Sequence, residues 1–169
     1  GPAQRSRVFF TQTLPWHPET ARIELWRGEV KVAERPVSAH WPTAEILGPP
    51  GGSFWPAGGE FPVDWIANDP DGGPLWYNLA YSKDDGVTWE MLATDLTESH
   101  AMVKGSQIPG SSTALFRVYS TDGVLTAAAT SGRISVEPKA PMVYIGRPEK
   151  GRVFPPGVPV GFNGTAMEW

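Results

Sequence analysis

One short segment of the 169-residue chain, Asn68–Gly73, places two carboxylates two positions apart on a tight loop and reads Asn-Asp-Pro-Asp-Gly-Gly. Oxygen ligands clustered on a tight loop are what Ca²⁺ requires, and the ion takes about six to eight of them. Asn68, Asp69 and Asp71 are therefore candidate calcium ligands. Asx-turns around proline and glycine explain the same residues without a metal. The sequence leaves both interpretations open.

Two tryptophans could present flat rings to a sugar or to a protein. Trp76 alternates with Leu75, Tyr77 and Leu79, and Trp26 alternates with Ile23 and Leu25. Successive side chains of a strand point to opposite faces, so both tryptophans fall on the side away from the apolar one. We expect Trp76 and Trp26 to be exposed. Such rings make contacts with ligands, and they also occur singly on ordinary protein surfaces.

A catalytic set is not visible. Cysteine is absent, which excludes disulfides and thiolate metal sites, and the three histidines stand far apart without a zinc-binding spacing. There is no nucleophile-elbow motif. We therefore expect no catalytic residues and no obligatory cofactor. Two carboxylates distant in sequence could still meet as a glycosidase pair, although a lone β-sandwich rarely offers the deep cleft that this needs.

Composition excludes other classes of partner. The net charge is −4 and only 19% of residues are charged, with Lys and Arg scattered singly. A basic patch for a nucleic-acid backbone is missing, so we expect no nucleic-acid binding. The sequence has no apolar run of the ~18–20 residues that a membrane span requires.

The segment from Ser82 to Trp89 carries the sharpest local signal, Ser-Lys-Asp-Asp-Gly-Val-Thr-Trp. Asp84 can accept hydrogen bonds from turn amides, Gly86 can take a left-handed backbone angle, and Trp89 can cover the hairpin from the returning strand. Five residues therefore form a candidate structural hairpin: Ser82, Asp84, Gly86, Thr88 and Trp89. This pattern predicts a folding device rather than an activity.

Short strands must position these residues. In the middle of the chain, alternating apolar runs bounded by Gly, Pro and Asp predict seven strands, at 44–47, 60–67, 75–82, 88–93, 100–104, 114–121 and 133–137, with 125–130 possible as part of the last. The alternation places Val63 and Trp65, Tyr77 and Leu79, and Phe116 and Val118 on inward faces. No window has a sustained helical period. The pattern is typical of an all-β, antiparallel sandwich.

One opening recurs at an offset of 99 residues. The first copy has Ile46, Pro49, Gly52, Trp55, Pro56 and Gly58, and the second has Ile145, Pro148, Gly151, Phe154, Pro155 and Gly157. A two-residue gap then aligns Val63, Trp65, Ala67 and Asp71 with Val160, Phe162, Gly164 and Glu168. The recurrence predicts one complete sandwich at 41–138 and the start of a second, truncated copy at 139–169.

Residues 1–40 look like the closing strands of a preceding β-module or a hairpin extension. A strand is expected at 8–14, and a hairpin from 21–26 and 30–35 with its turn at Arg27–Glu29. An isolated hairpin is barely stable in water, so both partial modules offer open strand edges. We expect neighbouring modules of the same polypeptide, or strands of another molecule, to pair with them.

Taken together, residues 42–137 resemble bacterial immunoglobulin-like or fibronectin type III-like repeats. The resemblance rests on Ile-Leu-Gly-Pro-Pro-Gly-Gly at 46–52, the 63–72 and 75–89 segments, and Leu-Phe-Arg-Val-Tyr-Ser-Thr-Asp-Gly at 115–123. The 82–89 segment also resembles the Asp-box of sialidases, which in those enzymes lies away from the catalytic groups. Many such bacterial repeats carry an acidic stretch where Asp69 and Asp71 stand.

The resemblance implies an extracellular or cell-surface location and a non-catalytic spacer or adhesion module. The alternative is a carbohydrate-binding accessory module of an extracellular hydrolase or peptidase, which would contact surface polysaccharide through its exposed rings.

Overall fold

The computed structural model describes residues 11–167, and the chain divides after Ala39 into two compact units. Both are built from β-strands, with a single three-residue 3₁₀ turn, Gly105–Gln107, in the described range. The all-β expectation is therefore confirmed. No helix among these residues is long and apolar enough to cross a membrane.

The N-terminal unit is a hairpin. Strand β1 (Arg22–Arg27) pairs antiparallel with β2 (Val30–Pro36), and Gly28 occupies the turn with a φ of 61°. Glycine adopts this left-handed angle without a steric penalty, which is why the turn forms where the sequence places it. The strand predicted at 8–14 is wrong for residues 11–14, which have no regular structure; its first residues lie outside the described range.

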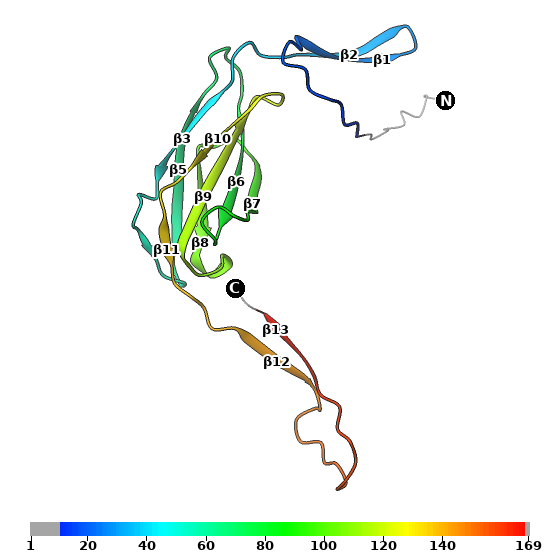
Figure 1. Ribbon diagram of the computed structural model, residues 1–169, viewed down its shortest axis with the longest axis vertical. Coiled ribbons are helices and arrows are strands. Elements are labelled where there is room, and N and C mark those ends of the chain that lie inside the picture. Colours follow the sequence, from blue (N-terminus) through cyan, green and yellow to red (C-terminus); the bar gives the residue numbers. More distant parts are fainter. Residues whose placement is uncertain (1–10, 168–169) are drawn as a thin grey trace, which may run out of the picture. The chain divides into compact units, whose positions relative to one another are not determined.

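Two sheets form the sandwich that follows (Figure 1). The smaller has the order β3 (Thr43–Gly48), β5 (Glu60–Asn68) and β8 (His100–Lys104). The larger has the order β4 (Phe54–Trp55), β11 (Ile134–Val136), β9 (Ser111–Thr121), β6 (Trp76–Ser82) and β7 (Glu90–Leu96), with β10 (Thr126–Thr130) also paired to β9.

The sandwich has nine strands in the described range where seven were expected. Strand β4 has only two residues, too few for an alternation to show. Strands β10 and β11 do not merge, because each pairs with a different part of the long strand β9 along the same edge. Between them Ser131 turns the chain, its amide donating to the Phe116 carbonyl at 2.9 Å.

The core lies between the two sheets and is rich in aromatic rings. Val63 and Trp65 from β5 face Leu79, Phe116 and Val118 from the larger sheet, and all are at most 2% exposed. Trp55 stacks on Phe61 with ring centroids 4.7 Å apart and also contacts Phe116. The inward faces predicted from alternation are therefore confirmed.

The C-terminal hairpin repeats the beginning of the sandwich. Strand β12 (Met142–Arg147) pairs with β13 (Asn163–Met167), and every residue pair equals a β3–β5 pair shifted by 99. Ile145↔Gly164, for example, corresponds to Ile46↔Trp65. The offset is therefore continuous through the second strand, and the two-residue gap expected there is wrong. A gap aligns the apolar side chains of the two sequences, whereas the backbone register keeps Phe162 in the place of Val63.

Candidate functional site

The turn from Ser82 to Trp89, which joins β6 to β7, is held by its own side chains. The Ser82 hydroxyl donates to Asp84 Oδ1 at 2.8 Å and accepts the Gly86 amide at 2.8 Å. Asp84 accepts the Thr88 amide at 2.7 Å and the Thr88 hydroxyl at 2.5 Å. The Trp89 indole donates to the Gly86 carbonyl at 2.9 Å. All five predicted residues therefore meet in one closed network.

Hydrogen bonds within the turn lower the pKa of the Asp84 carboxyl group. The Thr88 hydroxyl and amide, followed by the Ser82 hydroxyl, lower the Asp84 pKa from 3.8 to about 2. A carboxylate that accepts several hydrogen bonds favours its charged form. Asp84 is therefore ionised at neutral pH, and both of its carboxylate oxygens accept hydrogen bonds within the turn.

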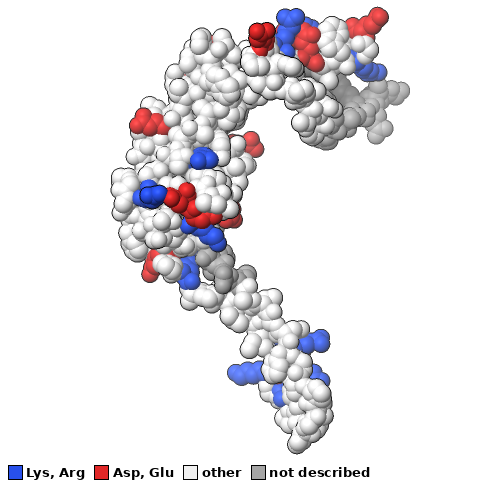
Figure 2. All heavy atoms as spheres, viewed as in Figure 1, with Lys and Arg blue, Asp and Glu red and all other residues white. Residues whose placement is uncertain are grey.

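A second layer of contacts fixes this turn to the rest of the sandwich. Both Asp85 carboxylate oxygens accept from Arg133, each at 2.5 Å, although the residues are 48 positions apart. The Arg117 guanidinium lies 4.0 Å from the centroid of the Trp89 ring. Bidentate pairs of this kind fix orientation as well as charge. On the face shown in Figure 2, basic and acidic side chains are intermixed over the sandwich.

The 68–73 loop follows β5, and its carboxylates have partners within the protein. Asp69 Oδ1 accepts the Asp71 amide at 3.0 Å, which closes an Asx-turn. Asp71 accepts the His40 amide and contacts the His40 ring, both at 2.7 Å. Gly72 has a φ of 77° and donates to the Asp69 carbonyl. The loop geometry is therefore explained by the turn.

No group of three or more His, Asp or Glu side chains in residues 11–167 is placed to hold a metal ion. Asp69 and Asp71 lie in one loop, but each is directed at a backbone amide, and Asn68 contributes its backbone carbonyl to the Thr43 hydroxyl at 3.2 Å. The structure thus places the three predicted calcium ligands in one loop, where Asp69 and Asp71 each accept a backbone amide.

The two candidate tryptophans differ. Trp26 is 51% exposed, as expected, and its indole donates to Glu24 Oε2 at 3.0 Å. Glu24 also accepts from Arg22 and Lys31, so the ring belongs to a polar network on one face of the N-terminal hairpin. Trp76 is only partly exposed, because β6 is an inner strand flanked by β7 and β9. The expectation that Trp76 is exposed is therefore wrong, since the residue is only partly exposed.

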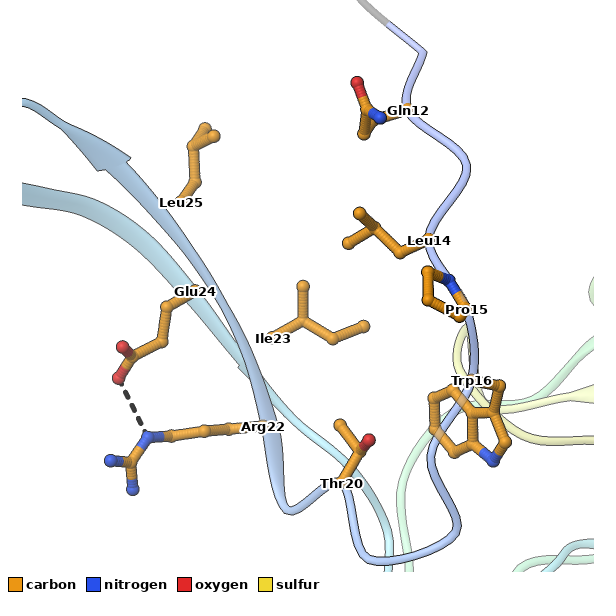
Figure 3. Close-up of a pocket in the computed structure, with 9 residues that line it drawn as sticks. All are labelled: Gln12, Leu14, Pro15, Trp16, Thr20, Arg22, Ile23, Glu24 and Leu25. Carbon is orange, nitrogen blue, oxygen red and sulfur yellow. Dashed lines mark hydrogen bonds and ion pairs between the residues drawn. The ribbon is translucent and has the colours of Figure 1, made fainter.

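The N-terminal unit also forms an open cleft of about 690 Å³ along β1. Figure 3 shows Leu14, Pro15 and Trp16 from the incoming segment facing Ile23 and Leu25 of β1. Arg22 and Glu24, which also line the cleft, bond to each other at 2.8 Å. The described lining is largely apolar, and its carboxylate, Glu24, accepts from Arg22, Lys31 and the Trp26 indole. Sequence alternation identified Ile23 and Leu25 as one face but could not place the 14–16 segment above them.

Comparison with protein-family models, with curated protein sequences and with solved structures finds no match to this chain.

Proposed function

We propose that the chain is a non-catalytic structural module, of the immunoglobulin-like or fibronectin type III-like kind, that spaces or joins other domains of a secreted or surface protein. The polar residues that looked capable of chemistry support this proposal, because they stabilise turns. Ser82, Asp84 and Thr88 bond to one another, and Asp69 bonds within its own loop. The recurrence of the same opening 99 residues later supports a modular role.

One observation carries the spacer function. Within the sandwich, β3 begins at one end and β11 finishes at the other, so the chain enters and leaves at opposite poles (Figure 1). The last strand is bonded in parallel to a strand near the start. Three amides make these bonds: Gly52 to the Arg133 carbonyl at 2.7 Å, Ser135 to Ser53 at 2.8 Å, and Glu137 to Trp55 at 2.9 Å.

This arrangement resists tension. When the two ends are pulled apart along the strands, the three bonds between the 52–55 and 133–137 segments are stretched together rather than one after another. The Glu137 carboxylate reinforces them by accepting the Ala57 amide at 2.8 Å. A module in this position would therefore keep its length when the polypeptide on either side is under load.

Single-molecule force measurements test the proposal. Because the chain has no cysteine, handles can be attached at introduced cysteines without interference. Pulling on the two ends of the sandwich should give one unfolding event that releases on the order of 300 Å of chain, as expected for residues 43–136 at full extension. Pulling at Pro74 and Thr97, at the open end of the β6–β7 hairpin, loads the bonds one at a time and should need a lower force.

Equal or lower force in the end-to-end geometry would overturn the spacer function. Turnover of a glycoside, polysaccharide or peptide that is lost on substitution of a single carboxylate would overturn the non-catalytic role.

A second candidate function, carbohydrate binding, is favoured by Trp26. The ring is half exposed and its orientation is set by Glu24, whose pKa is lowered chiefly by the hydrogen bond from Trp26 and by nearby Lys31. An oriented ring beside a carboxylate and two cations offers both stacking and hydrogen bonds to a sugar.

A panel of extracellular polysaccharides tests this candidate. Trp26→Ala should weaken binding by about tenfold or more. Trp41→Ala removes a tryptophan that is 60% exposed elsewhere and serves as the matched control. The candidate is abandoned if no polysaccharide binds, or if the two variants bind equally well.

A further inference from the structure

The β12–β13 hairpin reproduces the local geometry of β3–β5 beyond strand register. Gly52 and Gly151, 99 residues apart, have φ angles of 85° and 84°. The amides of Ser53 and Arg152 each donate to the carbonyl three residues earlier at 3.2 Å. The register shift after Ile46 recurs after Ile145. The two segments are therefore the same structural unit.

The equivalent side chains have opposite environments. In the first copy, Val63 is fully buried beneath the larger sheet. In the second copy, Phe162 occupies the same place and is 74% exposed, and on the same face Val143 and Ile145 are 70% and 63% exposed. These three residues define the inner face of the hairpin. Exposed apolar clusters of this kind mark surfaces that another structure covers.

The first copy shows what covers such a face. Strand β8 pairs antiparallel with residues 60–64 of β5, placing Ala101 opposite Val63 and Val103 opposite Phe61. The sheet formed by β4, β11, β9, β6 and β7 lies over the face itself. At an offset of 99, the edge for a β8-type strand is residues 159–163. The residue opposite Phe162 must be small, as Ala101 is.

We propose that the inner face of β12–β13 is a docking surface for a second β-sheet of the kind formed by β4, β11, β9, β6 and β7, with a β8-type strand pairing antiparallel to residues 159–163. This inference extends the modular function proposed above, since it identifies where the next module is built.

One difference between the copies sets the shape of the partner. Trp65 packs edge-on against Tyr77 with centroids 5.5 Å apart, and its counterpart is Gly164. Gly164 leaves empty the space that the Trp65 ring fills in the first copy. A partner sheet that suits this face therefore fills that space with a side chain larger than Tyr77, or the Phe162 ring occupies part of it. A copy of the protein's own larger sheet fits the backbone but leaves space at Gly164.

The test extends the full chain with a copy of its own residues 71–138 placed after Trp169, which continues the 99-residue repeat. Amide hydrogen exchange of Met142–Arg147 and Asn163–Met167 is compared with that of the 169-residue chain. Cooperative folding of a second sandwich should slow exchange by about 100-fold or more. Phe162→Asp should abolish this protection. Thr165→Asp, on the outer face where Ile66 is 56% exposed, should retain it.

In the extended chain, Gly164→Trp fills the space left opposite the copy of Tyr77. If poor packing at this point alone prevents the second sandwich from folding, the variant restores protection; if the surface is wrong, it does not. Absence of protection in both the extended chain and its Gly164→Trp variant would overturn the proposal. So would protection of the 169-residue chain that grows with protein concentration, because a second copy would then cover the face. The force measurement on residues 43–136 does not depend on either result, so the two proposals can fail separately.

Discussion

At the scale of single residues, Asp84 shows what local sequence can predict. Its partners Ser82 and Thr88 lie within four positions, so the spacing alone identifies the bonded turn. Arg133 was not predicted to join this turn, because it lies 48 residues from Asp85 along the chain. For the same reason the contact between His40 and Asp71 could not be inferred. Contacts that depend on the assembled sheets leave no local pattern.

The lowered pKa of Asp84 predicts a pH dependence of stability. The folded value of about 2 lies below the ordinary 3.8, so the charged carboxylate stabilises the fold above about pH 4. This contribution is lost as the pH falls from about 4 to about 2. Asp84→Asn should lower the melting temperature at pH 6, and the difference from the unaltered protein should narrow towards pH 2. A difference independent of pH would contradict the role of the charge.

Thr88→Val refines this prediction. The variant loses the hydroxyl bond to Asp84 but keeps the amide bond. Its melting temperature at pH 6 should therefore lie between those of Asp84→Asn and the unaltered protein. Thermal unfolding followed by circular dichroism measures the order of the three.

Gly86 gives a prediction that is independent of charge. Its φ is 86°, and an added Cβ would lie 3.3 Å from the Trp89 ring. Gly86→Ala should lower the free energy of unfolding by about 1–2 kcal/mol. Gly58→Ala is the control, because Gly58 lacks a left-handed angle and has open space around its Cβ position; it should change stability by less than about 1 kcal/mol. Equal losses in chemical denaturation would contradict this account.

At the scale of elements, alternation predicted the inward faces of β5, β6 and β9, since a period of two is set by strand geometry whatever the pairing. Pairing itself was not predictable. Strand β4 can be identified only from its parallel pairing with β11. Strands β10 and β11 are separate because they pair with different parts of β9. The partly covered Trp76 follows from the same limit, because its burial depends on which strands flank β6.

Strand β9 should therefore be the most sensitive element. Phe116 is fully buried and contacts the rings of Trp55 and Tyr81. Phe116→Ala should cost about 3–5 kcal/mol in urea denaturation. Phe54→Ala, in the edge strand β4 where Phe54 is 62% exposed, should cost less than about 1 kcal/mol. Similar costs for both would mean that the core is not organised around β9.

At the scale of the whole molecule, every member of the core cluster comes from residues 44–136. The sandwich should accordingly keep its stability when the N-terminal unit is removed. Deletion of residues 1–39 is expected to leave the urea midpoint of the main unfolding transition unchanged, with intrinsic fluorescence of the core tryptophans as the probe. A fall in that midpoint would show that the hairpin unit contributes to the fold of the sandwich.

The measurement that bears most directly on the proposed spacer function is the ratio of unfolding forces in the two pulling geometries. If the parallel bonds between β4 and β11 carry tension, pulling on the ends of the sandwich should require a clearly higher force than pulling at Pro74 and Thr97. A ratio of one or less would show that the opposite-pole arrangement bears no load, and would contradict the spacer function.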